Sequence, residues 1–315
     1  MRRLYLHVGL HKTGTSFLQR LALENRALLA EAGLGLGPFQ DASGSHHPIV
    51  EAIDRDGPEA VLDRVAEAQG QRLMISAEEL SSRLLEPSYA AALAAAAARH
   101  FEPHLVIFLR RQDFLKESAF AEIVKDWYWG DIRDDDHYHL DHAGRVAALE
   151  AAFGRGRVRV ALYRDPGPND IVADLLALTG TAVDRSRGSA VAPRFLARVV
   201  ADSDAIADDG GRFLMSPSER HALVAAHLDG NRALTDRLGI ADPGPFLELP
   251  DPDAPWTPPA PIAPREVAAV RRAALAACLR GRNPVAAARL AAQVARLLAP
   301  MAGRPVGPHA ADPVG

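Results

Sequence analysis

The N-terminal segment constrains the fold of this chain more than any other stretch. An apolar run, Leu4–Val8, leads into the turn Gly9–Gly14, and apolar residues at helical spacing follow at once through Leu29. A strand, a glycine-bounded loop and a helix in this order direct loop N–H groups and the positive end of the helix dipole to one point. We therefore expect an anion-binding site where the helix begins, near Gly14.

The side chains of this loop suit a phosphate-like group. Lys12 supplies a mobile positive charge, and hydroxyl donors follow at Thr13, Thr15 and Ser16. Gly9, Gly14 and Ser16 match the glycine and Ser/Thr positions of the nucleoside-triphosphate loop G-x-x-x-x-G-K-[ST]. The exception is Thr15, which stands where that loop has lysine. A lysine placed three residues earlier suits a group on a 5′-phosphate that is shorter than a triphosphate.

The rest of the N-terminal two thirds alternates strand and helix patterns. Short apolar runs predict strands at residues 71–76, 104–109 and 158–163, and residues 33–48 are predicted to be a loop. Helical spacing is found at residues 49–68 (broken near Gly57-Pro58), 89–100, 114–127, 144–153 and 171–178. This alternation predicts a P-loop-like, three-layer α/β/α fold with a mostly parallel central sheet and a helical C-terminal extension.

Composition changes along the chain predict its organisation. Residues 1–190 form the α/β core, and residues 191–300 form the helical extension, which contains a proline-rich segment at 242–264. Residues 301–315 are predicted to be a disordered tail.

Charge and cysteine usage exclude several kinds of partner and site. A formal net charge of −4 gives no basic surface for nucleic acid, and the single cysteine excludes a disulfide framework or a Cys-x-x-Cys metal site. No apolar run reaches membrane-spanning length, and Met1-Arg2-Arg3 leads directly into the strand that the loop requires. We therefore expect a cytoplasmic protein, and the sequence does not indicate its oligomeric state.

A second cationic residue follows another predicted strand. Arg110 comes directly after residues 104–109, and Ser118 follows it by eight positions on the next predicted helix. Such an arginine can hold a second phosphate with two parallel hydrogen bonds while the serine hydroxyl donates a third. The alternative is a surface pair, Arg110-Arg111, after a buried strand.

These two segments resemble those of sulfotransferases that use 3′-phosphoadenosine 5′-phosphosulfate (PAPS), especially the bacterial branch. His11–Ser16 resembles their phosphosulfate-binding loop. Arg110–Ser118 resembles their 3′-phosphate-binding segment, in which Asn-Pro-x-Asp usually follows the arginine; here Arg111-Gln112 replaces Asn-Pro. The resemblance covers about residues 4–190 and implies PAPS as donor, 3′-phosphoadenosine 5′-phosphate (PAP) as product, and no metal.

Two later segments extend the resemblance. Leu162–Asp165 is similar to the family's Tyr-Glu-acidic-Leu region, and Arg185–Ser189 corresponds to the part that closes over the adenosine. The resemblance thus implies nucleotide contacts from these residues: His11, Lys12, Thr13, Gly14, Thr15, Ser16, Arg110, Ser118 and Arg187.

Sulfuryl transfer needs a group for the leaving oxygen and a base for the acceptor. Lys12 is placed to stabilise the leaving oxygen, and we expect His11 to shape the loop. The family takes its base from the end of the second strand or from the loop before it. Glu78 and Glu79 follow the second predicted strand, and His46 and His47 lie in the loop before it. Of these four candidates for the base, we prefer Glu78 at the strand end and His47 in the loop.

The sequence does not identify the acceptor: carbohydrate, lipid, peptide and small natural product all remain open, and a small molecule or a glycan is the expected class. Trp127, Trp129 and Tyr138 can form an aromatic acceptor lid or pack a helix end, and the acidic run from Asp134 to His142 is expected to be a solvated loop rather than a metal site. Two alternative functions remain: an ATP-dependent kinase or phosphotransferase that needs magnesium, and a non-catalytic nucleotide-binding protein.

Overall fold

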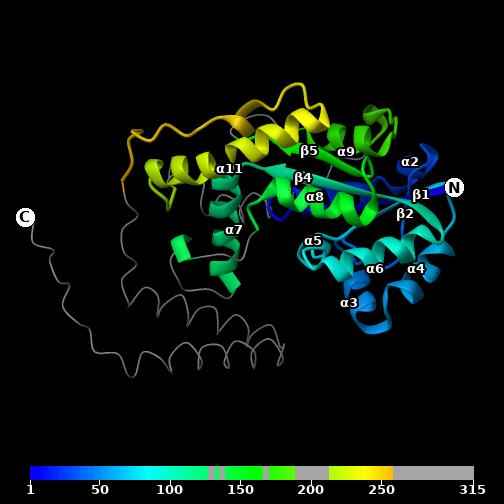
Figure 1. The fold of residues 1–315 in the computed structure, drawn as a ribbon. Helices are drawn as coiled ribbons and strands as arrows, with labels where there is room; N and C mark the ends of the chain where they lie inside the picture. The colour runs from blue at the N-terminus through cyan, green and yellow to red at the C-terminus, as the bar shows by residue number, and fades with distance from the viewer. Residues whose placement is uncertain (127–131, 135–138, 166–169, 189–212, 258–315) are drawn as a thin grey trace, which may run out of the picture. The chain divides into compact units, whose positions relative to one another are not determined.

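A five-stranded parallel sheet forms the centre of the protein (Figure 1). The computed structural model describes residues 1–126, 132–134, 139–165, 170–188 and 213–257. In chain order the strands are β1 (Arg2–Gly9), β2 (Gly35–Leu36), β3 (Arg72–Ser76), β4 (Phe101–Arg110) and β5 (Val158–Tyr163), and their order in the sheet is β2-β3-β1-β4-β5. After β1 the chain forms the edge strand β2, returns to β3 beside β1, and then crosses to β4 and β5 on the other side of β1. The carboxyl end of β1 lies where the strand order reverses, which is where open parallel sheets bind ligands.

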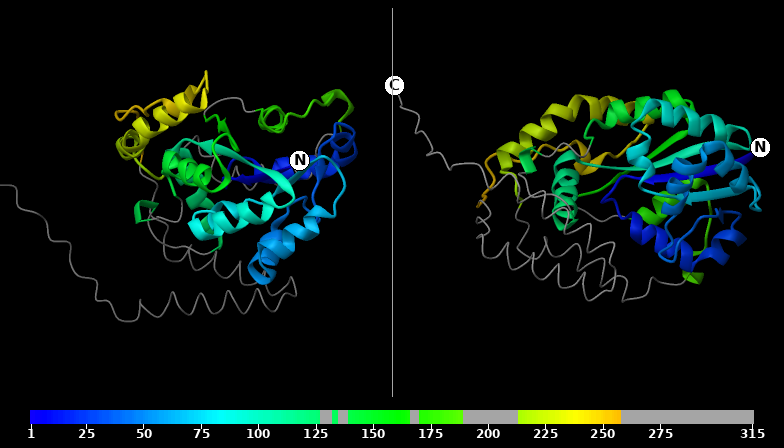
Figure 2. Two further views of the ribbon diagram at one scale, coloured as in Figure 1. Left: turned by 45° about the vertical axis from the view of Figure 1, so that its right-hand side comes forward. Right: turned by 90° about the horizontal axis from the view of Figure 1, so that it is seen from below.

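Helices cover both faces of this sheet (Figure 2). Alternate side chains of β1 point to opposite faces, so that Leu4, Leu6 and Val8 join one core and Tyr5 joins the other. The first core includes residues of α3 (His47–Asp56), α4 (Pro58–Ala66), α6 (Pro87–Ala98) and α8 (His142–Phe153). The second includes residues of α1 (Thr15–Glu24), α2 (Arg26–Glu31) and α9 (Ile171–Thr179). The predicted α/β/α layering with a parallel sheet is confirmed.

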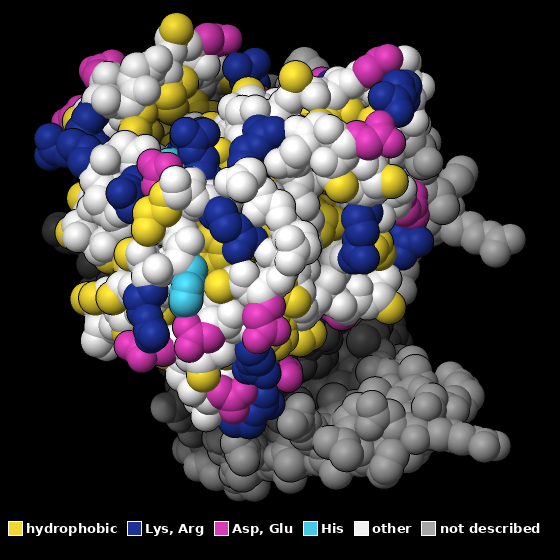
Figure 3. Space-filling model, turned by 90° about the vertical axis from the view of Figure 1, so that its right-hand side faces the viewer, with side chains coloured by type: hydrophobic (Ala, Val, Ile, Leu, Met, Phe, Trp, Pro, Cys, Tyr) yellow, Lys and Arg dark blue, Asp and Glu magenta, His cyan; other side chains and the backbone are white. Residues whose placement is uncertain are grey.

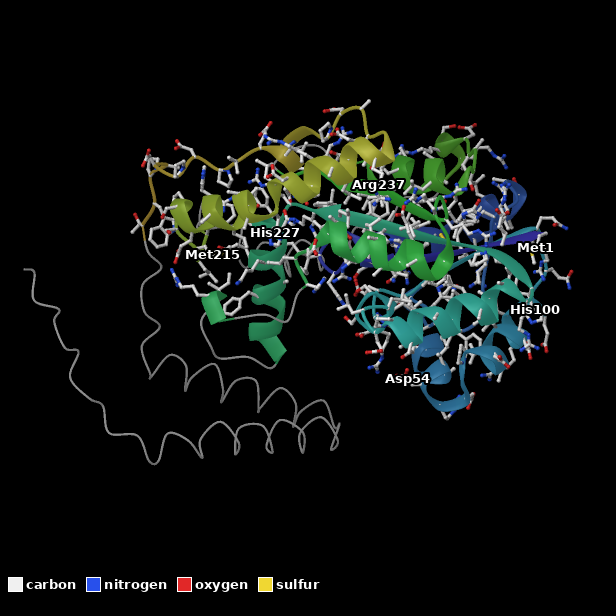
Figure 4. All side chains as sticks on the ribbon, in the orientation of Figure 1. Met1, Asp54, His100, Met215, His227 and Arg237 are labelled. Carbon is white, nitrogen blue, oxygen red and sulfur yellow. The ribbon has the colours of Figure 1, made fainter. Side chains whose placement is uncertain are left out.

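The other described elements are α5 (Leu80–Arg83), α7 (Gln112–Asp126), α11 (Pro217–Leu238) and the 3-10 helices η1 (Ile132–Asp134), η2 (Arg185–Arg187) and η3 (Gly244–Leu247). Of these, α5, α7, α11 and η3 also contribute buried residues to the first core. Helix α11 packs against α7 and α8. Arg237 of α11, labelled in Figure 4, forms an ion pair with Glu150 of α8. On the face drawn in Figure 3, basic and acidic side chains are interspersed.

Most elements predicted from the sequence are present, with small changes at their ends. The helical pattern at 49–68 forms two helices separated at Gly57, as the Gly-Pro pair predicted. Strand β2 was not predicted, because two residues, one of them glycine, carry no alternating pattern. The predicted boundary at residue 190 and the tail 301–315 lie outside the described residues and stay predictions.

The turn after β4 is held by buried charges. Asp113 is 0% exposed and accepts hydrogen bonds from Arg111 (2.7 and 3.0 Å) and from Arg220 of α11 (3.0 and 2.5 Å). Beside this group, the amides of Gln112 and Asn231 hydrogen-bond each other at 3.1 and 3.0 Å. Arg111 is only 5% exposed, so the surface interpretation of the Arg110-Arg111 pair is wrong for Arg111.

Replacing Asp113 with asparagine should destabilise the protein strongly. Removing its charge leaves the guanidinium groups of Arg111 and Arg220 buried without their shared carboxylate, which typically costs about 3 to 5 kcal/mol. Urea denaturation measures the change. Glu59→Gln is the control, because Glu59 forms an exposed ion pair with Arg99 and should have a several-fold smaller effect. Equal effects of the two variants would contradict this account.

Candidate active site

The loop between β1 and α1 has a tightly constrained backbone. Its φ angles are positive at Gly9 (77°), Lys12 (63°) and Gly14 (79°). The positive φ of Gly14 favours glycine, and a Cβ atom there would lie 2.5 Å from Cδ1 of Ile171 in α9, so that side chain would have to shift. Gly14 is the N-cap of α1 and has no side chain to cap the first turn. The N–H groups of that turn are therefore suited to an anion.

The loop hydroxyls have different roles. Thr13 Oγ1 donates to the carbonyl oxygen of Leu10 at 2.6 Å, and Thr15 Oγ1 donates to the same oxygen at 3.2 Å. Both threonines are buried, whereas Ser16 is exposed. The sequence predicted all three as donors to an anion. In this arrangement the two threonines hold the loop in shape, and Ser16 is the hydroxyl that a ligand can reach.

The second predicted anchor lies against this loop. At the end of β4, Arg110 donates from Nη1 to the carbonyl oxygen of Lys12 at 2.8 Å and to Ser118 Oγ at 2.7 Å. The ring of Tyr163 lies beside the guanidinium, 5.2 Å from Arg110 Cζ to the ring centroid. The structure thus brings Lys12, Arg110 and Ser118 together at the exits of two neighbouring strands.

Arg110 has a further partner that the sequence did not indicate. Its Nε and Nη2 atoms each lie 2.5 Å from Oδ2 of Asp165, which follows β5. The Arg110 and Asp165 side chains are only 13% and 21% exposed. A carboxylate therefore occupies one edge of the guanidinium.

Glu78 lies between two histidines on the other side of the loop. Its Oε2 atom is 3.8 Å from His11 Nδ1, and its Oε1 atom is 4.0 Å from His47 Nε2. The three residues come from the end of β3, the loop after β1 and the start of α3. A Cβ atom on Gly9 would lie 3.2 Å from Glu78 Cβ, so glycine lets the β3 end approach the loop. Glu78 and His47, the two predicted bases, therefore lie in one cluster.

The other two candidates for the base are placed differently. His46 is 1% exposed; its Nδ1 accepts from the N–H of Ser76 at 3.2 Å, and its Nε2 is 3.2 Å from the carbonyl oxygen of Gly37. Burial lowers the pKa of His46 to about 4. Both ring nitrogens are engaged, which removes His46 from the candidates. Glu79 is exposed at the start of α5.

A buried polar group that the sequence did not single out lies beneath the loop. His7 Nδ1 is 2.8 Å from Ser76 Oγ, and Gln19 Nε2 donates to the carbonyl oxygen and to Oγ of Ser76 at 3.2 and 3.1 Å. These bonds join β1, β3 and α1 directly below the site. The signal in the sequence is a histidine inside an otherwise apolar run.

The segment predicted to close over the adenosine borders a cavity of about 370 Å³ between α1, α2, α9 and η2. Phe17, Leu21, Val172, Val183, Arg185 and Gly188 are among its lining residues. Phe17 comes three residues after the loop. Arg187 is exposed and forms an ion pair with Glu31 at 2.7 Å.

The predicted aromatic acceptor lid, formed by Trp127, Trp129 and Tyr138, lies outside the described residues. Within the described ranges, no group of three or more His, Cys, Asp or Glu side chains is arranged to hold a metal ion. None of the described helices has the length and apolar character needed to cross a membrane.

The fold and this edge of the sheet define a P-loop-like α/β protein. The chain is similar in structure to a sulfotransferase from Alicyclobacillus acidocaldarius, with 19% sequence identity, coverage of 76% of this chain and 96% of that one, and a TM-score of 0.48. It is also similar to mouse sulfotransferase SULT7A1 complexed with PAP, with 14% identity, coverage of 91% and 87%, and a TM-score of 0.35. No protein-family model matches the chain, and a search of curated proteins finds no match.

Stability should fall as pH decreases from about 6.5 to about 4. Burial lowers the pKa values of His7, His46 and His142 from 6.5 to about 4, and His142 Nε2 lies 2.8 Å from the carbonyl oxygen of Arg110. In this window the unfolded chain binds more protons than the folded one, so each histidine removes about 1.4 kcal/mol per pH unit. Above pH 6.5 this contribution is fully present.

Urea denaturation at pH 7, 6 and 5 measures this slope. His46→Gln keeps a donor and an acceptor but removes one titrating group, so its stability should depend less steeply on pH than that of the unmodified chain. An unfolding free energy that stays constant between pH 7 and 5 would refute the assignment of these histidines as buried and neutral.

Proposed function

We propose that this protein is a sulfotransferase that moves a sulfuryl group from PAPS to a hydroxyl or amine of a small-molecule or glycan acceptor. The observation that carries the proposal is the contact of Arg110 with the Lys12 carbonyl and the Ser118 hydroxyl. It joins a loop suited to one phosphate to an arginine and serine suited to a second. A donor with anionic groups at both its 5′ and 3′ positions fits two adjacent anion holders.

Each part of the donor has a matching part of the site. The loop N–H groups, Lys12 and the exposed Ser16 are suited to the 5′-phosphosulfate. Arg110 and Ser118 are suited to the 3′-phosphate. We place the purine in the cavity bordered by Phe17, whose ring offers a stacking surface.

The proposed reaction is an in-line displacement at sulfur. The acceptor oxygen or nitrogen forms a bond to sulfur while the bond from sulfur to the 5′-phosphate oxygen breaks. Lys12 and the loop N–H groups stabilise the negative charge that grows on that leaving oxygen. The acceptor proton goes to Glu78 or to His47, whose Nε2 atom lies 4.0 Å from Glu78 Oε1. His11 lies on the opposite side of Glu78 and fixes the orientation of its carboxylate.

An ATP-dependent kinase on the same scaffold is the principal competing function. In kinases of this type a lysine immediately precedes the Ser/Thr that holds magnesium. Here that position is Thr15, which is buried and donates to the Leu10 carbonyl. The observed loop therefore favours a donor without a triphosphate.

Isothermal titration calorimetry separates these two functions. The unmodified chain should bind PAP and should prefer it to ATP with magnesium. Lys12→Met and Arg110→Gln should each weaken PAP binding about 10- to 100-fold, because each removes charge-assisted hydrogen bonds worth about 1.5 to 3 kcal/mol. Arg99→Gln is the matched charge control, because Arg99 follows α6 directly and forms an exposed ion pair with Glu59. Preferential binding of ATP with magnesium would refute the proposal.

Kinetics test the proposed base. PAP formation from PAPS is measured with a panel of phenols, amines and monosaccharides as acceptors. Glu78→Gln and His47→Asn should each lower kcat by about 100-fold or more while PAP affinity changes little. Glu79→Gln, next in the chain but exposed, should retain kcat. A chain that binds PAP but forms none from PAPS with any acceptor would instead be a nucleotide-binding protein without this activity.

A further inference from the structure

The guanidinium of Arg110 has two differently occupied edges. Nη1 donates to the Lys12 carbonyl and to Ser118 Oγ, which uses both of its N–H groups. Nε and Nη2 form the other edge, and both bond to the single oxygen Oδ2 of Asp165. The first edge holds the structure of the site together, whereas the second carries a charged partner that another anion can replace.

This occupancy conflicts with phosphate binding at the same place. A phosphate bound bidentately to the Nε–Nη2 edge takes the position that the Asp165 carboxylate now holds. Both anions cannot remain there, because like charges a few ångströms apart repel by several kcal/mol in a partly buried site. The Arg110 and Asp165 side chains are only 13% and 21% exposed, so water screens this repulsion weakly.

We infer, on the basis of the proposed function, that Asp165 is an internal competitor for the 3′-phosphate of the nucleotide. Binding exchanges carboxylate for phosphate at the Nε–Nη2 edge, while the Nη1 bonds to Lys12 and Ser118 persist and keep the loop in place. As PAP leaves, Asp165 returns to Arg110. Asp165 thus acts through Arg110 as a positioning residue that weakens product binding and speeds product release.

The test compares two nucleotides that differ only in the 3′-phosphate. Dissociation constants and dissociation rates of PAP and of adenosine 5′-phosphate are measured for the unmodified chain, Asp165→Asn and Asp165→Ala. We expect both variants to bind PAP about tenfold more tightly, with slower dissociation, because the competing charge is gone. Affinity for adenosine 5′-phosphate should change less than about twofold, since that ligand does not reach Arg110.

Glu59→Gln removes the same unit of charge from α4, in the opposite helical layer from α1, and controls for a general electrostatic effect. Thermal denaturation without ligand reports whether each variant folds, and the alanine variant also removes the carbonyl oxygen that asparagine retains.

Unchanged or weaker PAP binding in both variants would overturn the inference, as would equal tightening for the two nucleotides. If the unmodified chain does not prefer PAP to adenosine 5′-phosphate and Arg110→Gln changes neither affinity, the proposed function itself fails.

Discussion

The candidate site depends on one guanidinium group, that of Arg110. It contacts the loop after β1 through the Lys12 carbonyl, α7 through Ser118 and the segment after β5 through Asp165. Lys12 has a left-handed backbone (φ 63°), which costs a non-glycine residue roughly 1 to 2 kcal/mol. A charge-assisted hydrogen bond to its carbonyl contributes about 1.5 to 3 kcal/mol and offsets that strain. Arg110 therefore supports the conformation that places Lys12 in the loop, in addition to offering its own charge.

The position of the site follows from the parallel sheet, which is why much of it was predictable. The Lys12 loop follows β1, Glu78 follows β3, Arg110 ends β4 and Asp165 follows β5. Because parallel strands end at one edge, any polar residue just after an apolar run is brought to that edge. Order along the sequence was enough to predict that Lys12, Glu78 and Arg110 converge. It could not predict that Arg110 meets Asp165, because strand order brings both residues to this edge but does not set the direction of their side chains.

Adjacent residues with the same chemistry show where sequence patterns stop being informative. His46 and His47 are indistinguishable by type and position, yet His46 bonds to the backbone of Ser76 and Gly37, whereas His47 is directed at Glu78. The start of α3 lies between them, and the turn of the helix sends their side chains in different directions. The same limit applies to Thr13 and Thr15, whose hydroxyls suit an anion by type but donate to the Leu10 carbonyl in the folded loop.

Arg110 and Arg111 also differ, and the difference ties the site to a helix far along the chain. Arg110 extends toward the loop, while Arg111 turns to Asp113 and to the carbonyls of Pro245 and Glu248. Arg220 of α11 completes the charge pairing of Asp113. Since α7 begins at this turn and carries Ser118, these buried bonds fix the direction in which Ser118 meets Arg110. Helix α11 therefore supports Arg110 and Ser118 indirectly. Its Arg220 pairs with Asp113, and the buried ion pairs of Asp113 set the geometry of the turn between Arg110 and the helix that carries Ser118.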